Sequence, residues 1–265
     1  MDAYRVWWAE EDQREGRSAV ALVRFMRTSM LEEFALAAGA SALFSPDERT
    51  AASRWPADRE RRDILAAHVL ARCMLSEASG CDPGTIVLGA TPLGQAEVLL
   101  PARAVRYRVS LAHADGIALA AIAEDCSVGV DVQSLRAAGP DPQAAAGTVL
   151  SPDNLEALRR LEPHLRTGRF LMLWTRMEAL AKARGVAFAC AAGALASDAG
   201  GAWRPPASHG SETEVDATEG RIESWRVTPD HVAAVAILGL RSRSIRIRLE
   251  EVANVAPAAT AVARA

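Results

Sequence analysis

The chain has 265 residues, half of them apolar and 24% charged, which is enough for one large domain or two smaller ones with a substantial core. Its 30 lysine and arginine residues nearly balance 33 acidic residues, so the net charge of −3 gives no support for a general nucleic-acid binder. Ordinary glycine and proline contents exclude a collagen-like or broadly disordered chain.

The cysteines and the hydropathy pattern favour a cytoplasmic protein. The four cysteines form no Cys-x-x-Cys pair and have no adjacent histidine pattern, so they predict reduced thiols rather than disulfides or a zinc site. The first residues lack the basic start and apolar run of a signal peptide. The longest apolar runs, Ile117–Ala123 and Val232–Leu238, are much shorter than the roughly 20 residues that a membrane helix requires. The cysteines are Cys73, Cys81, Cys126 and Cys190.

Helical patterns precede strand patterns in the first half of the chain. Ser45-Pro46-Asp47-Glu48 has the composition of a helix start, with a capping serine and a proline in the first turn. Residues 62–75 then place apolar side chains at helical spacing. Four strand-like runs follow, two of them separated by the turn at His113–Gly116. These runs are Thr85–Leu88, Arg106–Leu111, Ile117–Ile122 and Val128–Val132.

The second half repeats this order. Ser151-Pro152-Asp153 again opens a helix, Arg169–Met172 begins a long apolar helix, and Val232–Ile237 reads like the earlier run Ile117–Ile122. The polar stretch Ser197–Gly220 is predicted to be a flexible loop. Two similar α+β lobes in a pseudo-twofold arrangement are the simplest explanation, and chance similarity of a common helix cap is the alternative. The predicted division is residues 1–126 for the first lobe, 127–250 for the second and 251–265 for a disordered tail.

One predicted strand carries an aspartate in its interior. In Val128–Gln133, strand alternation places Asp131 and Gln133 on the same face. A buried carboxylate needs a cation or several hydrogen-bond donors. Taken alone, the segment is better explained by an aspartate near a strand end that bonds a neighbouring backbone amide.

A later helix places an acid and a base on one face. Glu178 and Lys182 are four residues apart, so they project from the same side of the helix. Trp174 lies four residues before Glu178 and adds a large apolar group to this stripe, which makes a fully solvated carboxylate less expected. Taken alone, the pair would be explained as a weak surface ion pair.

Together, the two segments resemble the 4′-phosphopantetheinyl transferases of the Sfp type. That family has a Gly-Val/Ile-Asp strand motif followed by a Trp-x-x-Lys-Glu-Ala-x-x-Lys helix motif. Other segments are similar to the family's opening helix, its Arg-rich second helix and its Asn-x-Ser-His-Ser segment. The resemblance covers roughly residues 43–240 and implies a fold of two similar α+β halves. The three additional segments are Leu43–Arg49, Arg61–Arg72 and Val109–Gly116.

The resemblance implies Mg²⁺-dependent transfer of the phosphopantetheine arm of coenzyme A to a serine of an acyl or peptidyl carrier protein. Asp131, Glu178 and Gln133 would hold the Mg²⁺, a cation that prefers oxygen ligands. Asp131, Glu178 and Lys182 would form the catalytic set, with Glu178 taking the proton of the serine or orienting a water. Lys182 and His113 would contact phosphate oxygens.

The resemblance also implies a set of coenzyme A contacts and partners. Three arginines of the second helix are candidates for the ribose 3′-phosphate, although a solvated helix face explains each of them equally well. The expected partners are coenzyme A and a carrier protein, without nucleic acid or membrane, and the expected assembly is a monomer whose two lobes mimic a dimer. The three arginines are Arg61, Arg62 and Arg72.

The sequence departs from the family pattern at four positions. Met177 replaces a lysine, Gln95 replaces the lysine of a Gly-Lys-Pro segment, Ala112 replaces a serine, and Gln133 replaces a second acid. Each charge-assisted contact contributes about 1.5–3 kcal/mol, so the two absent lysines predict weaker coenzyme A binding unless arginines compensate. Two alternatives to an active transferase are therefore a non-catalytic relative that binds carrier domains and a coenzyme A or nucleotide sensor.

Overall fold

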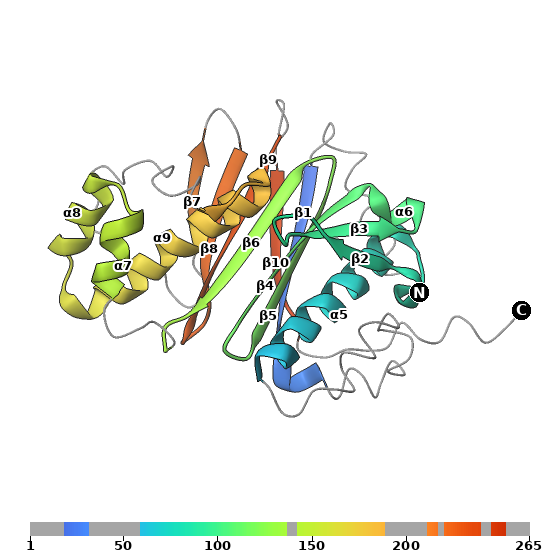
Figure 1. The fold of residues 1–265 in the computed structure, drawn as a ribbon, viewed down its shortest axis with the longest axis horizontal. Helices are drawn as coiled ribbons and strands as arrows, with labels where there is room; N and C mark the ends of the chain where they lie inside the picture. Colours follow the sequence, from blue (N-terminus) through green and yellow to red (C-terminus); the bar gives the residue numbers. More distant parts are fainter. Residues whose placement is uncertain are drawn as a thin grey trace, which may run out of the picture.

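A computed structural model describes residues 19–31, 59–136, 142–188, 211–216, 220–239 and 245–252 (Figure 1). These residues form an α+β fold with two four-stranded sheets and a two-stranded hairpin, which confirms the α+β part of the predicted fold class. The helix start predicted at Ser45–Glu48 and the thiol of Cys190 lie outside the described residues. In the described part of the chain, no helix combines the length and the apolar character needed to cross a bilayer.

The first sheet has the strand order β10-β1-β5-β4. Strand β10 runs parallel to β1, whereas the other neighbours are antiparallel. Helix α5 packs against β4 and β5, and Figure 1 shows it over this sheet. The elements are β1 (Ala19–Arg27), α5 (Arg59–Ser79), β4 (Tyr107–Ala114), β5 (Ile117–Glu124) and β10 (Ile245–Glu251).

The second sheet has the order β6-β9-β8-β7, with all neighbours antiparallel. Helix α9 packs along β6 and β9, and the shorter helices α7 and α8 contact α9 (Figure 1). The elements are β6 (Ser127–Ser134), α7 (Pro142–Val149), α8 (Pro152–Arg160), α9 (Pro163–Arg184), β7 (Ser211–Asp216), β8 (Gly220–Thr228) and β9 (His231–Leu238).

Smaller elements complete the first half of the chain: one follows β1, and the others lie between α5 and β4. A hairpin of β2 and β3 follows α5, and Gly94 at its tip has φ +77°, which favours glycine. The elements are the 3-10 helices η1 (Thr28–Met30) and η2 (Pro83–Thr85), strands β2 (Val87–Ala90) and β3 (Ala96–Leu100), and helix α6 (Ala102–Val105).

Several predicted boundaries are confirmed and others are wrong. Ser151 caps α8 by accepting from the backbone N–H of Asn154 at 3.3 Å, as its sequence predicts. Helix α9 begins at Pro163 rather than near Arg169. Pro163 and His164 are exposed and residues 165–168 are only partly buried, so no continuous apolar stripe marks these turns in the sequence. The predicted loop Ser197–Gly220 contains strand β7, which lies at a sheet edge where polar sequences are tolerated.

Strand β10 links the end of the chain to the first sheet. Its residues fall mainly within the segment assigned by sequence to the second lobe, yet they pair with β1 from Ala19↔Ile245 to Phe25↔Glu251. Ile247 and Leu249 pack against the apolar cluster that joins both sheets. Alternation of apolar and charged residues gives β10 one face for that cluster, which the sequence pattern did not assign to a partner.

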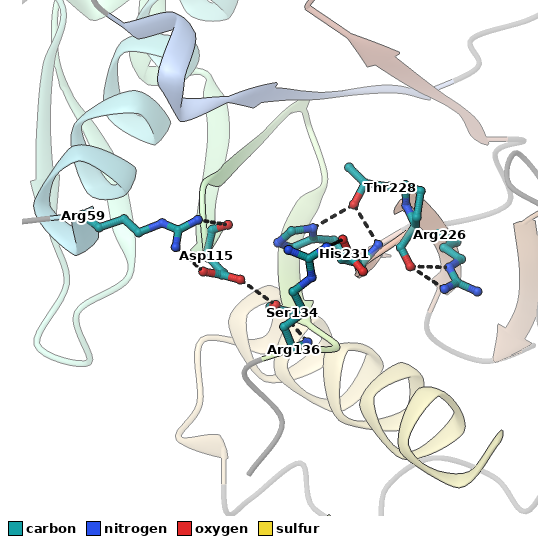
Figure 2. Close-up of polar contacts among 9 residues, drawn as sticks. Arg59, Asp115, Ser134, Arg136, Arg226, Thr228 and His231 are labelled. Atoms are coloured by element: carbon teal, nitrogen blue, oxygen red, sulfur yellow. Dashed lines mark hydrogen bonds and ion pairs between the residues drawn. The ribbon is translucent and has the colours of Figure 1, made fainter. Parts of the chain in front are cut away.

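Strands β4 and β6 form the junction between the two sheets. The Val130 backbone N–H donates to Ser110 Oγ at 3.0 Å, and both groups are buried. At the end of the junction, Asp115 pairs with Arg59 Nη1 at 2.9 Å and accepts from Ser134 Oγ at 3.0 Å (Figure 2). Asp115 therefore connects α5, the β4–β5 turn and the end of β6.

A buried carboxylate fixes the same turn from the side of α5. Asp63 is 2% exposed and accepts from Thr28 Oγ1 at 2.6 Å and from the Gly116 backbone N–H at 2.8 Å. Both carboxylate oxygens of Asp63 thus have donors, as a buried acid requires. These bonds hold the β4–β5 turn against the first turns of α5, three residues beyond His113.

Candidate active site

Gly129 allows α9 to lie directly against β6. A Cβ atom at this position would be 2.0 Å from the Ala179 carbonyl oxygen and 2.5 Å from the Ala183 backbone nitrogen. Real Cβ atoms essentially never approach backbone atoms this closely, so any larger residue would force the helix away. The glycine of the strand motif therefore sets the distance between the strand and the helix that carry the candidate residues.

Lys182 joins the strand motif to the helix motif. Its Nζ donates to the Val130 carbonyl oxygen at 2.9 Å and to Asp131 Oδ1 at 3.0 Å. Gln133 Nε2 donates to Asp131 Oδ2 at 3.1 Å. Asp131 is 6% exposed, and these two donors supply the compensation that its burial requires.

Glu178 lies one helical turn before Lys182 and is half-buried. Burial raises the pKa of the Glu178 carboxyl, the negative charge of Asp131 raises it further, and Lys182 opposes both effects. The negative charges of Asp131 and Glu178 therefore repel each other beside Lys182. Protonation of one carboxyl group or a bound cation would relieve this unfavourable proximity.

A cavity of about 530 Å³ opens between α5, β4, the β2–β3 hairpin and α9. Glu178 and Lys182 line it from α9, while Asp131 is connected to it through its ion pair with Lys182. Gln95 from the hairpin and Ser110 from β4 add uncharged polar groups to the wall. The apolar part of the wall includes Ile64, Leu93, Val109, Leu111, Val186 and Phe188.

His113 of β4 also lines this cavity and is half-buried. Burial lowers the pKa of its imidazole, and Lys182 lowers it further. The negative charges of Asp63, Glu60 and Asp131 act in the opposite direction. His113 therefore faces the same space as Glu178 and Lys182.

An aromatic pair that the sequence did not predict lies beside the cavity. Phe188 lines the cavity, and its ring centroid is 4.5 Å from that of Trp174. Gly185 ends α9 with φ +68°, which allows the chain to turn back toward Trp174. The glycine followed by an apolar residue was the available sequence signal, but the contact itself depends on how the chain turns.

The three predicted arginines do not line this cavity. Arg72 is 1% exposed, and its Nε donates to the Ile86 carbonyl oxygen at 3.0 Å. The Arg72 side chain is therefore buried against the backbone that precedes β2 and does not reach the cavity wall. Arg61 and Arg62 are exposed in the first turns of α5 and are absent from the cavity wall.

The positions that depart from the family pattern have different surroundings. Met177 is 1% exposed and packs in a cluster with Ile222 and Ala234, so its side chain is part of the core beneath α9. Ala112 packs in the apolar cluster between the sheets. Gln95 alone among these three faces the cavity. Of these three departures from the family pattern, only Gln95 therefore replaces a lysine at a position that faces the cavity.

The oxygen donors near the cavity suit a hard cation that keeps several waters. Within the described ranges, no group of three or more histidine, cysteine or acidic side chains is placed to hold a metal ion. Asp131 and Glu178 nevertheless provide two carboxylates, and Gln133 lies beside Asp131 with its Nε2 donating to Oδ2. Mg²⁺ commonly binds through one or two protein carboxylates together with waters and substrate phosphates, so these residues fit it.

Comparison with known proteins shows which proteins this part of the chain is similar to. Residues 127–236 match the family model described as the 4′-phosphopantetheinyl transferase superfamily. The match confirms the predicted relationship to this superfamily, and both candidate motifs lie within it.

Two curated relatives support the same assignment. The chain is 27% identical over 149 residues to the "Putative 4′-phosphopantetheinyl transferase slr0495" of Synechocystis sp., covering 56% of this chain and 59% of that protein. It is 28% identical over 150 residues to the 4′-phosphopantetheinyl transferase HetI of Nostoc sp., covering 55% of this chain and 61% of that protein. The chain thus matches about three fifths of the length of these relatives.

Proposed function

We propose that this protein transfers the 4′-phosphopantetheine group of coenzyme A to a serine of an acyl or peptidyl carrier protein. The observation that carries the proposal is the ion pair between Lys182 and Asp131, which joins the two family motifs beside a cavity. Glu178 and His113 on the same cavity wall supply a carboxylate and an imidazole. The superfamily match over both motifs supports the same chemistry.

The proposal assigns Mg²⁺ to Asp131 and Glu178, with Gln133 beside them. When bound, the ion would neutralise charge on the pyrophosphate of coenzyme A. The chain itself contributes Lys182, which holds Asp131 in place and has a third N–H direction available for a phosphate oxygen. His113 would donate a hydrogen bond to another phosphate oxygen.

Glu178 is proposed as the proton acceptor in the transfer. The serine oxygen of the carrier forms a bond to the phosphorus that bears the pantetheine arm, and the bond from that phosphorus to the bridging oxygen breaks. Adenosine 3′,5′-bisphosphate leaves with the bridging oxygen, and the serine proton passes to Glu178 directly or through a water. Its raised pKa makes Glu178 a better proton acceptor than an ordinary solvated carboxylate.

We also propose a two-lobe organisation for the chain. The first lobe would comprise residues 1–126 and the second 127–250, in a pseudo-twofold arrangement, with β10 added to the first sheet and a tail to residue 265. The presence of one long helix over each four-stranded sheet supports this division. A monomeric, cytoplasmic protein is the corresponding assembly and location, with the lobe junction as its active site.

A second candidate is a weakened or inactive relative that binds coenzyme A or a carrier protein. The observation that favours it is the presence of Gln95 at the cavity wall where the family pattern has a lysine. A binding protein would retain carrier affinity in the Asp131→Ala and Glu178→Ala variants. Metal-dependent changes in that affinity would instead support the transferase.

The transferase proposal is tested by mass spectrometry of apo-carrier proteins incubated with coenzyme A and Mg²⁺. Wild-type protein should add one phosphopantetheine to at least one acyl or peptidyl carrier, and Glu178→Gln should reduce the rate by two or more orders of magnitude. Asp153→Asn, at an exposed position in the first turn of α8, is the matched control and should leave the rate unchanged. Equal rates for wild type and Glu178→Gln would contradict the assigned role of Glu178.

A further inference from the structure

Ser110 of β4 is a buried polar residue to which the proposed transfer assigns no role. It is 5% exposed, although it also belongs to the cavity wall. A buried hydroxyl is destabilising unless it is hydrogen-bonded. The Val130 backbone N–H donates to Ser110 Oγ at 3.0 Å and offsets this burial. A serine at this position is therefore explained by one specific bond rather than by apolar packing.

This bond joins two strands that no sheet ladder connects. Strand β4 lies at the edge of the first sheet and β6 at the edge of the second, and the two strands are in contact. Val130 is fully buried, and a buried N–H without a partner costs about as much as a lost hydrogen bond. Ser110 Oγ supplies the acceptor that a ladder would otherwise provide.

The same stretch of β6 carries the ion pair of the candidate site. The Val130 carbonyl oxygen accepts from Lys182 Nζ at 2.9 Å, and Oδ1 of the next residue, Asp131, accepts from the same Nζ at 3.0 Å. Residue 130 is therefore held at its N–H by the first sheet and at its carbonyl group by α9. A shift of this backbone would move Asp131 and change the distance from Lys182 to both of its acceptors.

We infer that Ser110 is a positioning residue for the Lys182–Asp131 pair and acts through the backbone of Val130. This inference rests on the proposed function, because it takes the pair as part of the transfer machinery. A displacement of about 1 Å can reduce the rate of an enzyme about 100-fold when it affects groups that must be aligned. Loss of the bond to Ser110 should therefore lower kcat, while KM for the carrier protein changes little.

The experiment compares Ser110→Thr with Ser110→Val. The two replacements have nearly the same shape, but only threonine keeps a hydroxyl oxygen that can accept from the Val130 N–H. Carrier modification is measured by mass spectrometry with saturating Mg²⁺, at a temperature well below the Tm of every variant. Ser110→Val should lose about 10- to 100-fold in kcat with carrier KM within about 3-fold of wild type, whereas Ser110→Thr should retain most of the wild-type kcat.

Two further variants separate positioning from a general loss of stability. Ser110→Ala removes the hydroxyl without adding a methyl group, so it should behave like Ser110→Val and replaces it if the larger side chains prevent folding. Ser76→Ala is the matched control, because Ser76 Oγ donates to the Cys81 carbonyl oxygen at 2.7 Å in the last turn of α5 and does not line the cavity. Ser76→Ala should lower Tm and leave kcat unchanged.

Amide hydrogen exchange tests the bond independently of the reaction. The Val130 amide should exchange about tenfold or more faster in Ser110→Val than in Ser110→Thr, because only the valine variant leaves this N–H without its acceptor. The same comparison applies to Ser110→Ala and wild type.

The outcomes separate this inference from the proposed function. If wild type modifies a carrier and Ser110→Val has the same kcat as Ser110→Thr, the role of Ser110 is overturned and the transferase proposal stands. If folded wild type modifies no carrier, the transferase proposal fails, and exchange of the Val130 amide alone decides the inference: faster exchange in Ser110→Val supports it, and equal exchange overturns it. A loss of kcat in Ser110→Val that Ser110→Thr restores, with unchanged kcat in Ser76→Ala, supports the inference.

Discussion

The close approach of α9 to β6 gives a direct prediction for Gly129→Ala. The added Cβ would lie 2.0 Å from the Ala179 carbonyl oxygen, and this backbone atom can move only if the helix moves. Overpacking of a well-packed interior typically costs 1–3 kcal/mol, and a clash with backbone belongs at the upper end, about 3 kcal/mol. For a chain of this size, that loss corresponds to a decrease in Tm of about 6–12 °C.

The assay is thermal and chemical unfolding of wild type, Gly129→Ala and a matched control. Gly147→Ala is the control, because a Cβ at Gly147 in α7 would meet no atom within 4 Å and the residue has ordinary helical geometry. That control should be unchanged or stabilised by up to about 1 kcal/mol. A Gly129→Ala protein with wild-type Tm and wild-type transfer rate would refute the argument that this glycine sets the strand–helix distance.

The remaining predictions concern ionisable residues. Lys182→Met should reduce the free energy of unfolding by about 3 kcal/mol in denaturant titrations, because Asp131 stays buried without its cation. Arg160→Met breaks an exposed pair with Glu156 and should change the free energy of unfolding by less than about 0.5 kcal/mol. Equal effects of the two substitutions would contradict the reasoning. Because the pKa of Glu178 is raised on folding, the contribution of Glu178 to stability is present at acid pH and lost as pH rises. In metal-free buffer, Glu178→Gln should therefore be more stable than wild type at pH 8 but not at pH 4. The opposite order would be inconsistent with the raised pKa. Burial lowers the pKa of His231, whose Nδ1 lies 2.8 Å from Thr228 Oγ1 (Figure 2). His231 therefore takes up a proton more readily in the unfolded chain, and stability should fall from pH 7 to pH 5. His231→Gln should lose less stability over this range, as measured by the denaturant midpoint.

The local parts of the fold were predictable because their signals lie within short segments. Continuous β-branched and alanine-rich runs identified β5, β6 and β9, and apolar residues at helical spacing identified α5. The pairing of β10 with β1 was not predictable in this way, since the two strands are separated by more than 200 residues in sequence and only the folded chain brings them together.

The candidate site shows the same division between local and non-local information. Helical spacing correctly placed Glu178 and Lys182 on one face, and the resemblance to a known family indicated that Asp131 belongs with them. Spacing alone favoured a pair between Glu178 and Lys182, whereas the structure pairs Lys182 with Asp131 on another element.

Arg72 illustrates why residue type and helix position were insufficient. Its sequence context is that of a basic helix residue, which suits either a ligand contact or a solvated face. The structure buries it and satisfies its Nε with the Ile86 carbonyl oxygen, which lies 14 positions further along the chain. The position of that carbonyl is set by the turn after α5, so no pattern within the helix could indicate it.

The most direct test of the account is the binding of Mn²⁺, an EPR-visible substitute for Mg²⁺, in the presence of coenzyme A. The account holds that Asp131 and Glu178 act on one divalent cation beside the ligand, so wild type should bind one Mn²⁺ per chain, and Asp131→Asn and Glu178→Gln should each weaken this binding by at least tenfold. Asp153→Asn should bind as wild type does. Unchanged Mn²⁺ affinity in both site variants, with coenzyme A bound, would contradict the shared site.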